Sequence, residues 1–371
     1  MAWKGRPMAT RTMKLKAAGQ SLWLDNIQRK ELHDGTLQRM MAEDGICGVT
    51  SNPTIFMNAV SQSFDYDDQI AVLAKEKKTA AEIYHAVTIT DIRDAAKLFL
   101  PVYEKTGKKD GFVSIEINPQ LAFNIEESVR EARDILQEIG LDNIMIKVPA
   151  TREGISIIRQ LTAEGVNVNA TLIFSPECCR DVAQAYIAGL EQRLEKGLDI
   201  SDVHSVASFF ISRIDTSVDK LIDTAGESSL RGKAAVSVAK KTFTLYQALF
   251  SDPRFLRLKE KGAGAQRLLW ASTGTKDPAY SDIKYVEELI VENTVNTLPP
   301  KTIAAFRDHG EITTSFESGL ADGETVLKSI QAVGIDLDQV YADLQTAGVK
   351  AFEKSYLDLL DAISEKGMKL A

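Results

Sequence analysis

Short apolar runs of strand length recur along the chain, and each is followed by a segment with the pattern of an amphipathic helix. Eight runs are candidates for strands: 22–25, 46–50, 112–117, 144–148, 166–174, 203–211, 267–273 and 295–298. Strands that alternate with helices are typical of a parallel sheet, and eight repeats favour a sheet that closes on itself. The sequence therefore predicts an α/β fold, a (β/α)8 barrel.

The segments between these runs carry the signals that begin and end helices. Ser175 and Pro176, for example, combine an N-cap with a proline at the first helical position. Helices are expected over 91–105, 124–139, 175–197 and 281–292. The alternative fold, an open doubly wound sheet, lacks its nucleotide-binding fingerprint, because the Gly-Ala-Gly at 262–264 has no third glycine and precedes a strand.

The connections between the expected strands are unequal in length. The insertion over 53–111 is long enough for two or three extra helices after the second strand. After the eighth strand, residues 338–366 carry apolar side chains at helical spacing, which predicts a C-terminal helical extension that packs on the barrel. No linker rich in Pro, Gly or Ser and no internal repeat divides the sequence. We therefore expect one domain over 1–371, with 1–18 as a flexible basic leader.

Composition and charge narrow the class of function. The 371 residues are 44% hydrophobic and 26% charged, which is ordinary for a globular protein. The net charge of −8 argues against nucleic acid or a membrane surface as a partner. Three cysteines, two of them adjacent, fit a reducing compartment such as the cytoplasm. The sequence has no HExxH or CxxC motif and no apolar run of membrane-spanning length, so neither a metal site nor a membrane helix is expected.

Polar side chains recur where barrel strands should be apolar. Inward side chains of such a barrel normally form a packed core, and catalytic groups lie at the carboxyl ends of the strands. An unpaired amide or hydroxyl in that core costs about 2–7 kcal/mol. Polar residues nevertheless stand within or just after most of the expected strands: Asp25, Asn52, Ser114, Glu116, Asn118, Lys147, Asn167, Asn169, Thr171, Ser208 and Arg213. This pattern predicts a polar pocket at the mouth of the barrel.

Lys147 is the sharpest of these signals, because Ile146 and Val148 flank it within a strand. Lysine is almost never fully buried unless it is paired. A structural interpretation is an ion pair with Glu116 on the neighbouring strand, or a side chain that reaches solvent. The functional interpretation is a Schiff-base nucleophile, since burial lowers the pKa of a lysine and frees the neutral amine to attack a carbonyl. Glu116 would then move protons through a water held by Thr171.

Several motifs in chain order together resemble transaldolase. They are LWLD at 22–25, TSNPT at 50–54, SIE at 114–116, IKVP at 146–149 and NVNATLIFS at 167–175. The resemblance runs from about residue 20 to the C-terminus, and WASTGTK at 270–276 is similar to a long bacterial branch of that family. It implies a barrel of the class I, Schiff-base aldolase type that needs no cofactor.

The resemblance also implies a reaction and a role for each matching catalytic residue. A dihydroxyacetone unit would move from sedoheptulose 7-phosphate or fructose 6-phosphate to glyceraldehyde 3-phosphate or erythrose 4-phosphate, in the non-oxidative pentose phosphate pathway. Lys147 would form the imine with C2 of the ketose. Asp25 would take the proton from the C4 hydroxyl. Glu116 and Thr171, with a water, would handle the protons of carbinolamine formation and breakdown.

The resemblance implies substrate-binding residues as well. Asn52 and Asn169 would hold the hydroxyls of the retained three-carbon unit. The phosphate would be bound by Arg213, Ser208 and Ser272. Shorter relatives usually carry an arginine in the loop after the seventh strand, whereas here the nearby cation is Lys276, which binds phosphate without the bidentate fork of arginine. A solvated surface lysine is the alternative for Lys276.

Other interpretations stay open at this point. One is a Schiff-base aldolase resembling fructose-6-phosphate aldolase, which releases free dihydroxyacetone. Those shorter relatives use a tyrosine near the position of Phe210, and phenylalanine cannot donate a proton. Another is a barrel without activity that binds sugar phosphates or a protein partner. Asp25 could also be a structural partner of Arg29. The oligomeric state is left open, a homo-oligomer included.

Overall fold

The computed structural model describes residues 10–313 and 315–370. Within these residues eight parallel strands form a barrel in sequential order, which is closed by pairing between β1 and β8. The strands are β1 (Ser21–Asp25), β2 (Val49–Thr50), β3 (Val113–Glu116), β4 (Ile144–Pro149), β5 (Val168–Ile173), β6 (Ser205–Phe210), β7 (Arg267–Ala271) and β8 (Val295–Leu298). The predicted (β/α)8 barrel is confirmed.

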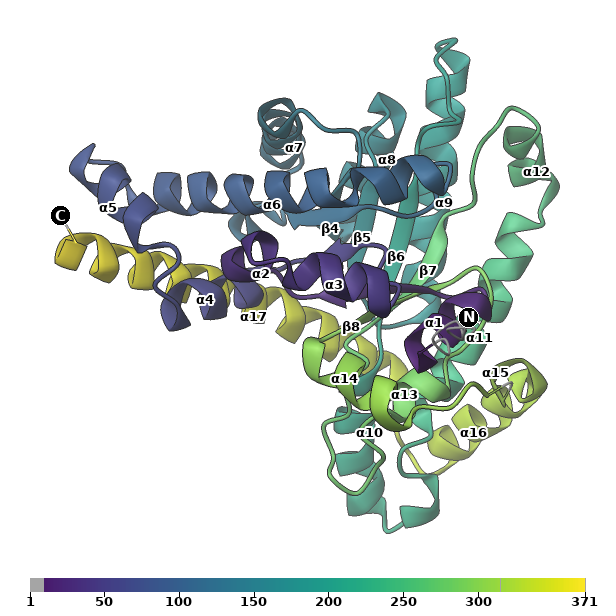
Figure 1. Cartoon of the computed structure of the whole chain (residues 1–371). Helices are drawn as coiled ribbons and strands as arrows, with labels where there is room; N and C mark the ends of the chain where they lie inside the picture. The colour runs from purple at the N-terminus through teal and green to yellow at the C-terminus, as the bar shows by residue number, and fades with distance from the viewer. Residues whose placement is uncertain (1–9, 314, 371) are drawn as a thin grey trace, which may run out of the picture.

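Helices surround the strands (Figure 1). They are α1 (Arg11–Ala17), α2 (Arg29–His33), α3 (Thr36–Glu43), α4 (Pro53–Gln62), α5 (Asp67–Lys75), α6 (Ala80–Lys105), α7 (Ile125–Ile139), α8 (Arg152–Glu164), α9 (Pro176–Glu195), α10 (Ser212–Ala225), α11 (Ala234–Phe250), α12 (Pro253–Lys259), α13 (Lys284–Glu287), α14 (Pro300–His309), α15 (Ser315–Ser318), α16 (Leu320–Ala332) and α17 (Leu337–Leu370). Short 3₁₀ turns occur at Pro119–Leu121 and Ser228–Leu230. No helix among these combines the length and the hydropathy that crossing a bilayer requires.

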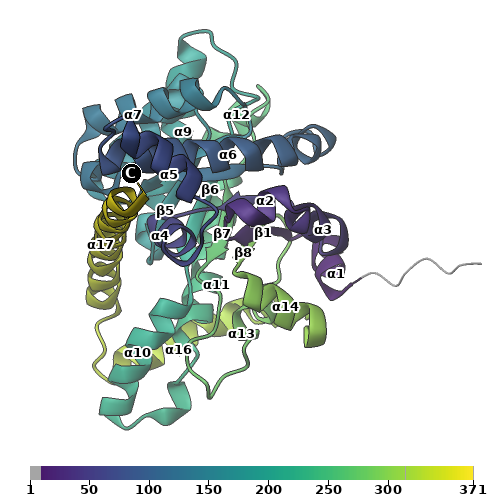
Figure 2. The same ribbon diagram turned by 60° about the vertical axis from the view of Figure 1, so that its left-hand side comes forward.

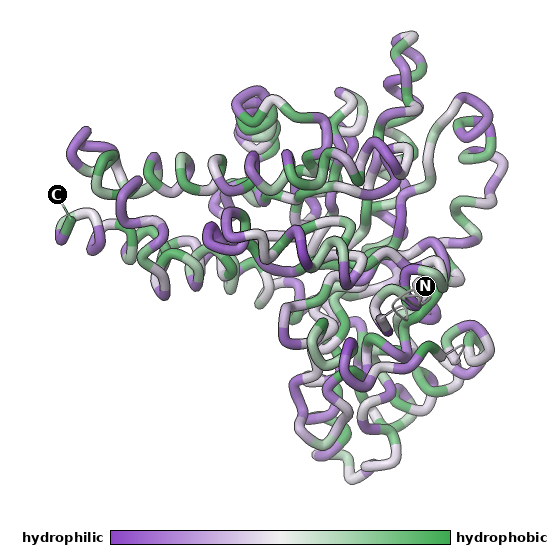
Figure 3. Tube along the Cα trace, viewed as in Figure 1, coloured by the Kyte–Doolittle hydropathy of each residue, from purple (hydrophilic) through white to green (hydrophobic). Residues whose placement is uncertain are grey.

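The predicted helix starts use the caps that the sequence indicates. The side chain of Asn124 accepts a hydrogen bond from the backbone N–H of Glu127, which begins α7. Ser175 does the same for Cys178 at the start of α9, where proline occupies the first helical position. Such caps satisfy N–H groups that have no partner within the helix. In Figure 3 helices such as α6 alternate between hydrophobic and hydrophilic colour, as expected for helices with one buried face.

The insertion after β2 and the C-terminal helix form an arm that projects from the barrel. The insertion folds into α4, α5 and α6, and α17 packs against all three. The end of α17 lies beside α5 in both Figure 1 and Figure 2. There Lys366 donates to the backbone carbonyl of Ser63 and to Asp67, each at 2.6 Å. The predicted extra helices and C-terminal extension are therefore confirmed.

A buried polar network closes the amino ends of the strands. Asp110 accepts hydrogen bonds from the Ser21 hydroxyl at 2.8 Å and from the Trp23 indole at 3.1 Å. It also pairs with Arg267 at 3.0 Å. Because these groups satisfy one another, they close the base of the barrel without leaving an unpaired charge. This leaves the carboxyl ends of the strands as the open end of the barrel, where functional groups belong in this fold.

Two expectations about the chain require correction. The helix expected over 281–292 is only the single turn Lys284–Glu287. Beyond it the carbonyl of Leu289 accepts from the Gln20 side chain at 2.7 Å, so the backbone is used for contacts outside a helix as it approaches β8. The flexible leader is wrong for Arg11–Ala17, which form α1 with Leu15 fully buried. Residues 1–9 of that expected leader lie outside the described residues. The interpretation of 1–371 as one domain stays a prediction.

Candidate active site

Strand pairing brings the predicted residues to the carboxyl end of the barrel. Glu116 on β3 pairs with Lys147 on β4, and Lys147 pairs in turn with Asn169 on β5. Asp25, the last residue of β1, pairs with Thr50 on β2. Since these strands are parallel and adjacent, their carboxyl ends meet at one mouth.

Lys147 is buried inside the barrel, with its side chain only 5% exposed. Its Nζ donates to the backbone carbonyl of Ser51 at 2.8 Å and to Glu116 Oε2 at 3.4 Å. The ring of Phe352, from α17, lies over the amine with its centroid 5.7 Å from Nζ. The amine therefore does not reach solvent, and the expected pairing with Glu116 is present.

Glu116 is as deeply buried as the lysine. Burial raises the pKa of its carboxyl to about 7, although the positive charge of Lys147 acts in the opposite direction. The second carboxyl oxygen, Oε1, and the hydroxyl of Thr171 are both buried and make no hydrogen bond within the described residues. Unsatisfied buried polar atoms are uncommon in folded proteins and call for an explanation. An acceptor and a hydroxyl of this kind can bind a water molecule or a hydroxyl of a bound molecule.

Asp25 is held at the mouth by a hydroxyl chain. Its Oδ1 accepts from Thr50 Oγ1 at 2.7 Å, and that hydroxyl lies 2.6 Å from the hydroxyl of Thr297. Burial raises the pKa of Asp25, while the Thr50 hydrogen bond and the charge of Lys147 act to lower it. Arg29 pairs with Asp91 at 2.8 Å instead. The structural alternative for Asp25, an ion pair with Arg29, is therefore not formed.

The two asparagines differ in what they already bind. Asn52 caps α4, since its side-chain oxygen accepts from the N–H of Ile55 at 3.0 Å. Asn169 is fully buried and donates to Ser114 Oγ at 3.1 Å, while Ser208 donates to its oxygen at 2.6 Å. Ser208 thus contacts Asn169 in this structure, and phosphate binding by Ser208 stays a prediction.

An irregularity in β5 adjoins Thr171. Relative to β6, β5 contains one extra residue between Ala170 and Ile173. Leu172 lies within this bulge and has a φ of 58°, in the left-handed region. A leucine in that region costs about 1–3 kcal/mol and persists only where the surrounding structure holds it. Bulges commonly re-aim side chains next to active sites.

Three further residues form a candidate anion-binding corner at the start of α10. Arg213 is the second residue of this helix, and its guanidinium lies 5.4 Å from the ring centroid of Phe210. Among residues 10–313 and 315–370 the Arg213 side chain forms no ion pair with a carboxylate and donates no hydrogen bond. Ser212 and Ser272 place their hydroxyl oxygens 3.1 Å apart beside it. A helix N-terminus with a free arginine favours a phosphate group.

The sequence did not single out Ser212, although its position could have indicated it. It stands directly before Arg213, where the chain leaves β6 and begins a helix. Lys276 lies exposed in the loop after β7, near enough for its charge to lower the pKa of Asp25. Phosphate binding by Lys276 stays a prediction. Across the described ranges no group of His, Cys, Asp or Glu is arranged to hold a metal ion.

Comparison with known proteins agrees with the motifs. The family model described as Transaldolase/Fructose-6-phosphate aldolase matches residues 22–363. A protein named Transaldolase from Saccharopolyspora erythraea is 45% identical over 354 residues, which cover 95% of this chain and 96% of the relative. Another of the same name, from Thiobacillus denitrificans, is 46% identical over 355 residues, covering 95% and 99%. The resemblance seen in the sequence is confirmed.

Proposed function

The chain belongs to the transaldolase/fructose-6-phosphate aldolase family, and on that premise we propose that it is a Schiff-base transaldolase. It moves a dihydroxyacetone unit from fructose 6-phosphate or sedoheptulose 7-phosphate to erythrose 4-phosphate or glyceraldehyde 3-phosphate. One observation carries the proposal: the amine of Lys147 is buried 3.4 Å from Glu116, whose other oxygen, like the Thr171 hydroxyl, has no described partner.

The first step joins the donor to the enzyme. The neutral amine of Lys147 attacks C2 of the ketose, and the carbonyl oxygen becomes the hydroxyl of a carbinolamine. Loss of that hydroxyl as water leaves a protonated imine. Glu116 accepts and returns protons in these steps through a water that its Oε1 and Thr171 hold. A carboxyl with a pKa near 7 suits this task, because it exchanges protons readily near neutral pH.

The second step breaks and remakes a carbon–carbon bond. Asp25 removes the proton of the C4 hydroxyl, the C3–C4 bond breaks, and its electron pair moves into the imine to give an enamine. The shortened aldose leaves. The enamine then attacks the carbonyl carbon of the acceptor aldose, Asp25 returns a proton to the new C4 oxygen, and hydrolysis of the imine frees Lys147. Because the imine itself accepts the electron pair, these steps require no cofactor.

Polar side chains at the mouth of the barrel bind the different parts of the substrate. The phosphate is bound by Arg213 with Ser212 and Ser272, since this corner offers a guanidinium without a described partner and a helix N-terminus. Asn52 and Asn169 bind hydroxyls of the three-carbon unit. Ser208 contributes to this binding by orienting the Asn169 amide. Lys276 supplies a weaker, exposed charge to the phosphate.

A Schiff-base aldolase is the second candidate. It would protonate the enamine and release free dihydroxyacetone. Phe210, at the carboxyl end of β6, packs against Phe174 with ring centroids 5.3 Å apart and offers no proton. The apolar surface of these two rings favours transfer of the three-carbon unit to an acceptor over protonation of the enamine.

A coupled assay separates the candidates. With fructose 6-phosphate, a transaldolase forms glyceraldehyde 3-phosphate rapidly only when erythrose 4-phosphate is added. Fast release of dihydroxyacetone without an acceptor would favour the aldolase. Binding of sugar phosphates without turnover would identify a barrel that has lost its activity. The proposed setting is the non-oxidative pentose phosphate pathway in the cytoplasm, with no nucleic-acid partner.

A further inference from the structure

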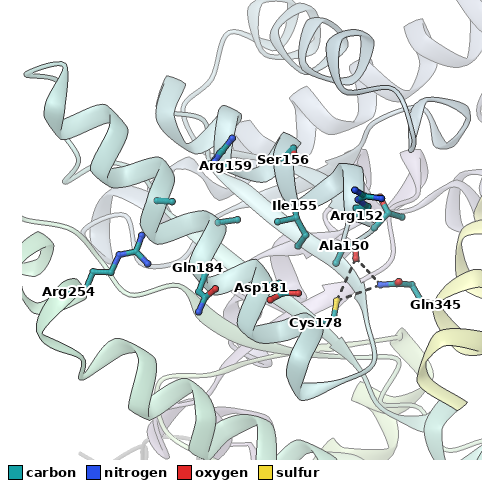
Figure 4. A pocket seen from close by; sticks show the side chains of 13 residues that line it. Ala150, Arg152, Ile155, Ser156, Arg159, Cys178, Asp181, Gln184, Arg254 and Gln345 are labelled. Carbon is teal, nitrogen blue, oxygen red and sulfur yellow. Dashed lines mark hydrogen bonds between the residues drawn. The ribbon is translucent and has the colours of Figure 1, made fainter. Parts of the chain in front are cut away.

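One side chain of the C-terminal helix links the ends of two catalytic strands. Nε2 of Gln345, on α17, donates to the carbonyl of Ala150 at 2.8 Å and to that of Leu172 at 3.3 Å. Figure 4 shows the Gln345 amide directed at Ala150, beside Cys178. Because these two groups are carbonyl oxygens, only the NH₂ end of the amide can face them. Nε2 also lies 3.6 Å from the sulfur of Cys178, but sulfur is a weaker acceptor than a carbonyl oxygen, so the two hydrogens of the group chiefly serve the two carbonyls.

These two carbonyls flank the strand ends that hold the proposed chemistry. Ala150 directly follows β4, the strand of Lys147, and Leu172 lies in β5 next to Thr171. Ala150 is further tied to β5, because its N–H donates to the carbonyl of Thr171 at 2.8 Å. Gln345 therefore completes a set of bonds that joins the two strand ends at the level of Thr171.

The same helix also fixes the side chain of Leu172. A Cβ atom added at Gly348, one turn after Gln345, would lie 2.9 Å from Cδ2 of Leu172. Leu172 thus packs against bare helix backbone, while its carbonyl is held by Gln345. Leu172 has the left-handed φ of 58° that needs such support from its surroundings.

We propose that Gln345 is a positioning residue for the transfer reaction, with Gly348 providing the space that this role requires. By holding the bulge at Leu172, Gln345 keeps the hydroxyl of Thr171 on the inner face of β5, in place for proton transfer with Glu116. This inference rests on the proposed function, because the role of Thr171 belongs to it.

Two substitutions of Gln345 test the inference. Gln345→Met keeps an unbranched side chain of similar length without a donor, and Gln345→Ala removes the side chain from a helix that favours alanine. Gln339→Met is the matched control, because Gln339 lies exposed on the same helix and its side chain, among the described residues, bonds only to Asp343. We expect both Gln345 variants to lower kcat about 10-fold, with KM changed by less than about 2-fold, and Gln339→Met to change neither.

The same substitution in a chain that also carries Thr171→Val separates a positioning role of Gln345 from a general loss of structure. In a Thr171→Val chain the bulge has no hydroxyl to place, so Gln345→Met should lower kcat by less than about 2-fold further. An unchanged kcat in either folded Gln345 variant would overturn the inference. So would an equal loss of kcat with and without the Thr171 hydroxyl. If the unmodified chain transferred no dihydroxyacetone unit, the proposed function would fail instead, so the two failures are distinguishable.

Discussion

Glu116 and Lys147 face each other from paired positions on β3 and β4, with Oε2 and Nζ 3.4 Å apart. Their side chains are 3% and 5% exposed. An ion pair this deeply buried seldom adds net stability, because the desolvation of both charges offsets their attraction. Stability alone therefore does not account for this pair, whereas the proposed imine chemistry uses both groups.

The raised pKa of Glu116 predicts a pH dependence of stability. The pKa of Glu116 is about 7 in the folded protein, against an ordinary value of 4.5. At a pH between these two values, the native protein therefore holds a proton that the unfolded chain has lost. The free energy of unfolding should therefore fall as pH rises through this window. Glu116→Gln removes this titration. The melting temperature of the variant, relative to that of the unmodified chain, should therefore rise between about pH 5 and pH 7. Parallel melting curves across the window would contradict the assignment.

Thr171→Val should separate activity from stability. The substitution replaces a hydroxyl that has no described partner by a methyl group of similar size. Because no hydrogen bond with another described residue is lost, we expect the melting temperature to be unchanged or slightly higher. The kcat should fall about 10-fold to 100-fold if the hydroxyl helps to hold the proton-transferring water. A clear drop in melting temperature with full activity would show that the hydroxyl serves only structure.

Arg213→Met should weaken binding of the phosphate. Its guanidinium is half-buried and has no carboxylate partner among the described residues, so the loss falls on the substrate. We expect KM for fructose 6-phosphate to rise at least about 10-fold, as a charge-assisted contact of about 1.5–3 kcal/mol is removed. Arg130→Met, at an arginine that is 68% exposed, is the control and should leave KM unchanged. An unchanged KM in Arg213→Met would mean that the phosphate binds elsewhere.

Lys276→Ala should have a smaller effect than Arg213→Met. Lys276 is exposed in the loop after β7, where solvent and salt screen its charge. We expect KM to rise less than about 5-fold, and the rise to shrink as salt is added, because the contact is one of point charges. KM values measured at low and high salt test this directly. A rise in KM as large as that of Arg213→Met would place Lys276 in direct contact with the phosphate.

Much of the fold was predictable because local signals and burial agree. Strands such as β4 are short apolar runs, and the helices between them begin at Asn124 and Ser175 with ordinary caps. The predictions failed where tertiary contacts decide the outcome. Leu289 follows a helical pattern, yet its carbonyl bonds to Gln20, which is far away in the sequence. Leu15 belongs to a basic segment but is buried against the rest of the chain.

In the candidate site, too, residues marked by the local sequence were predictable, and those that depend on tertiary contacts were not. Lys147 was predictable, because a lysine between isoleucine and valine in a barrel strand is unusual on its own. Gln345 was not, since a glutamine in an amphipathic helix gives no sign of which carbonyls it will meet. The bulge at Leu172 was also hidden, because the alternating pattern of apolar and polar residues over 166–174 is that of a regular strand. Contacts between distant elements account for both omissions.

The most direct measurement is reductive trapping of the proposed imine. Borohydride added with fructose 6-phosphate should convert the imine into a stable amine, and peptide mass spectrometry should locate the added three-carbon unit on Lys147. Lys147→Met should show no such adduct while it still melts cooperatively, because without the positive charge of Lys147 the buried Glu116 carboxyl stays protonated and neutral. An adduct that persists in Lys147→Met, or one located on another lysine of the unmodified chain, would contradict the central claim.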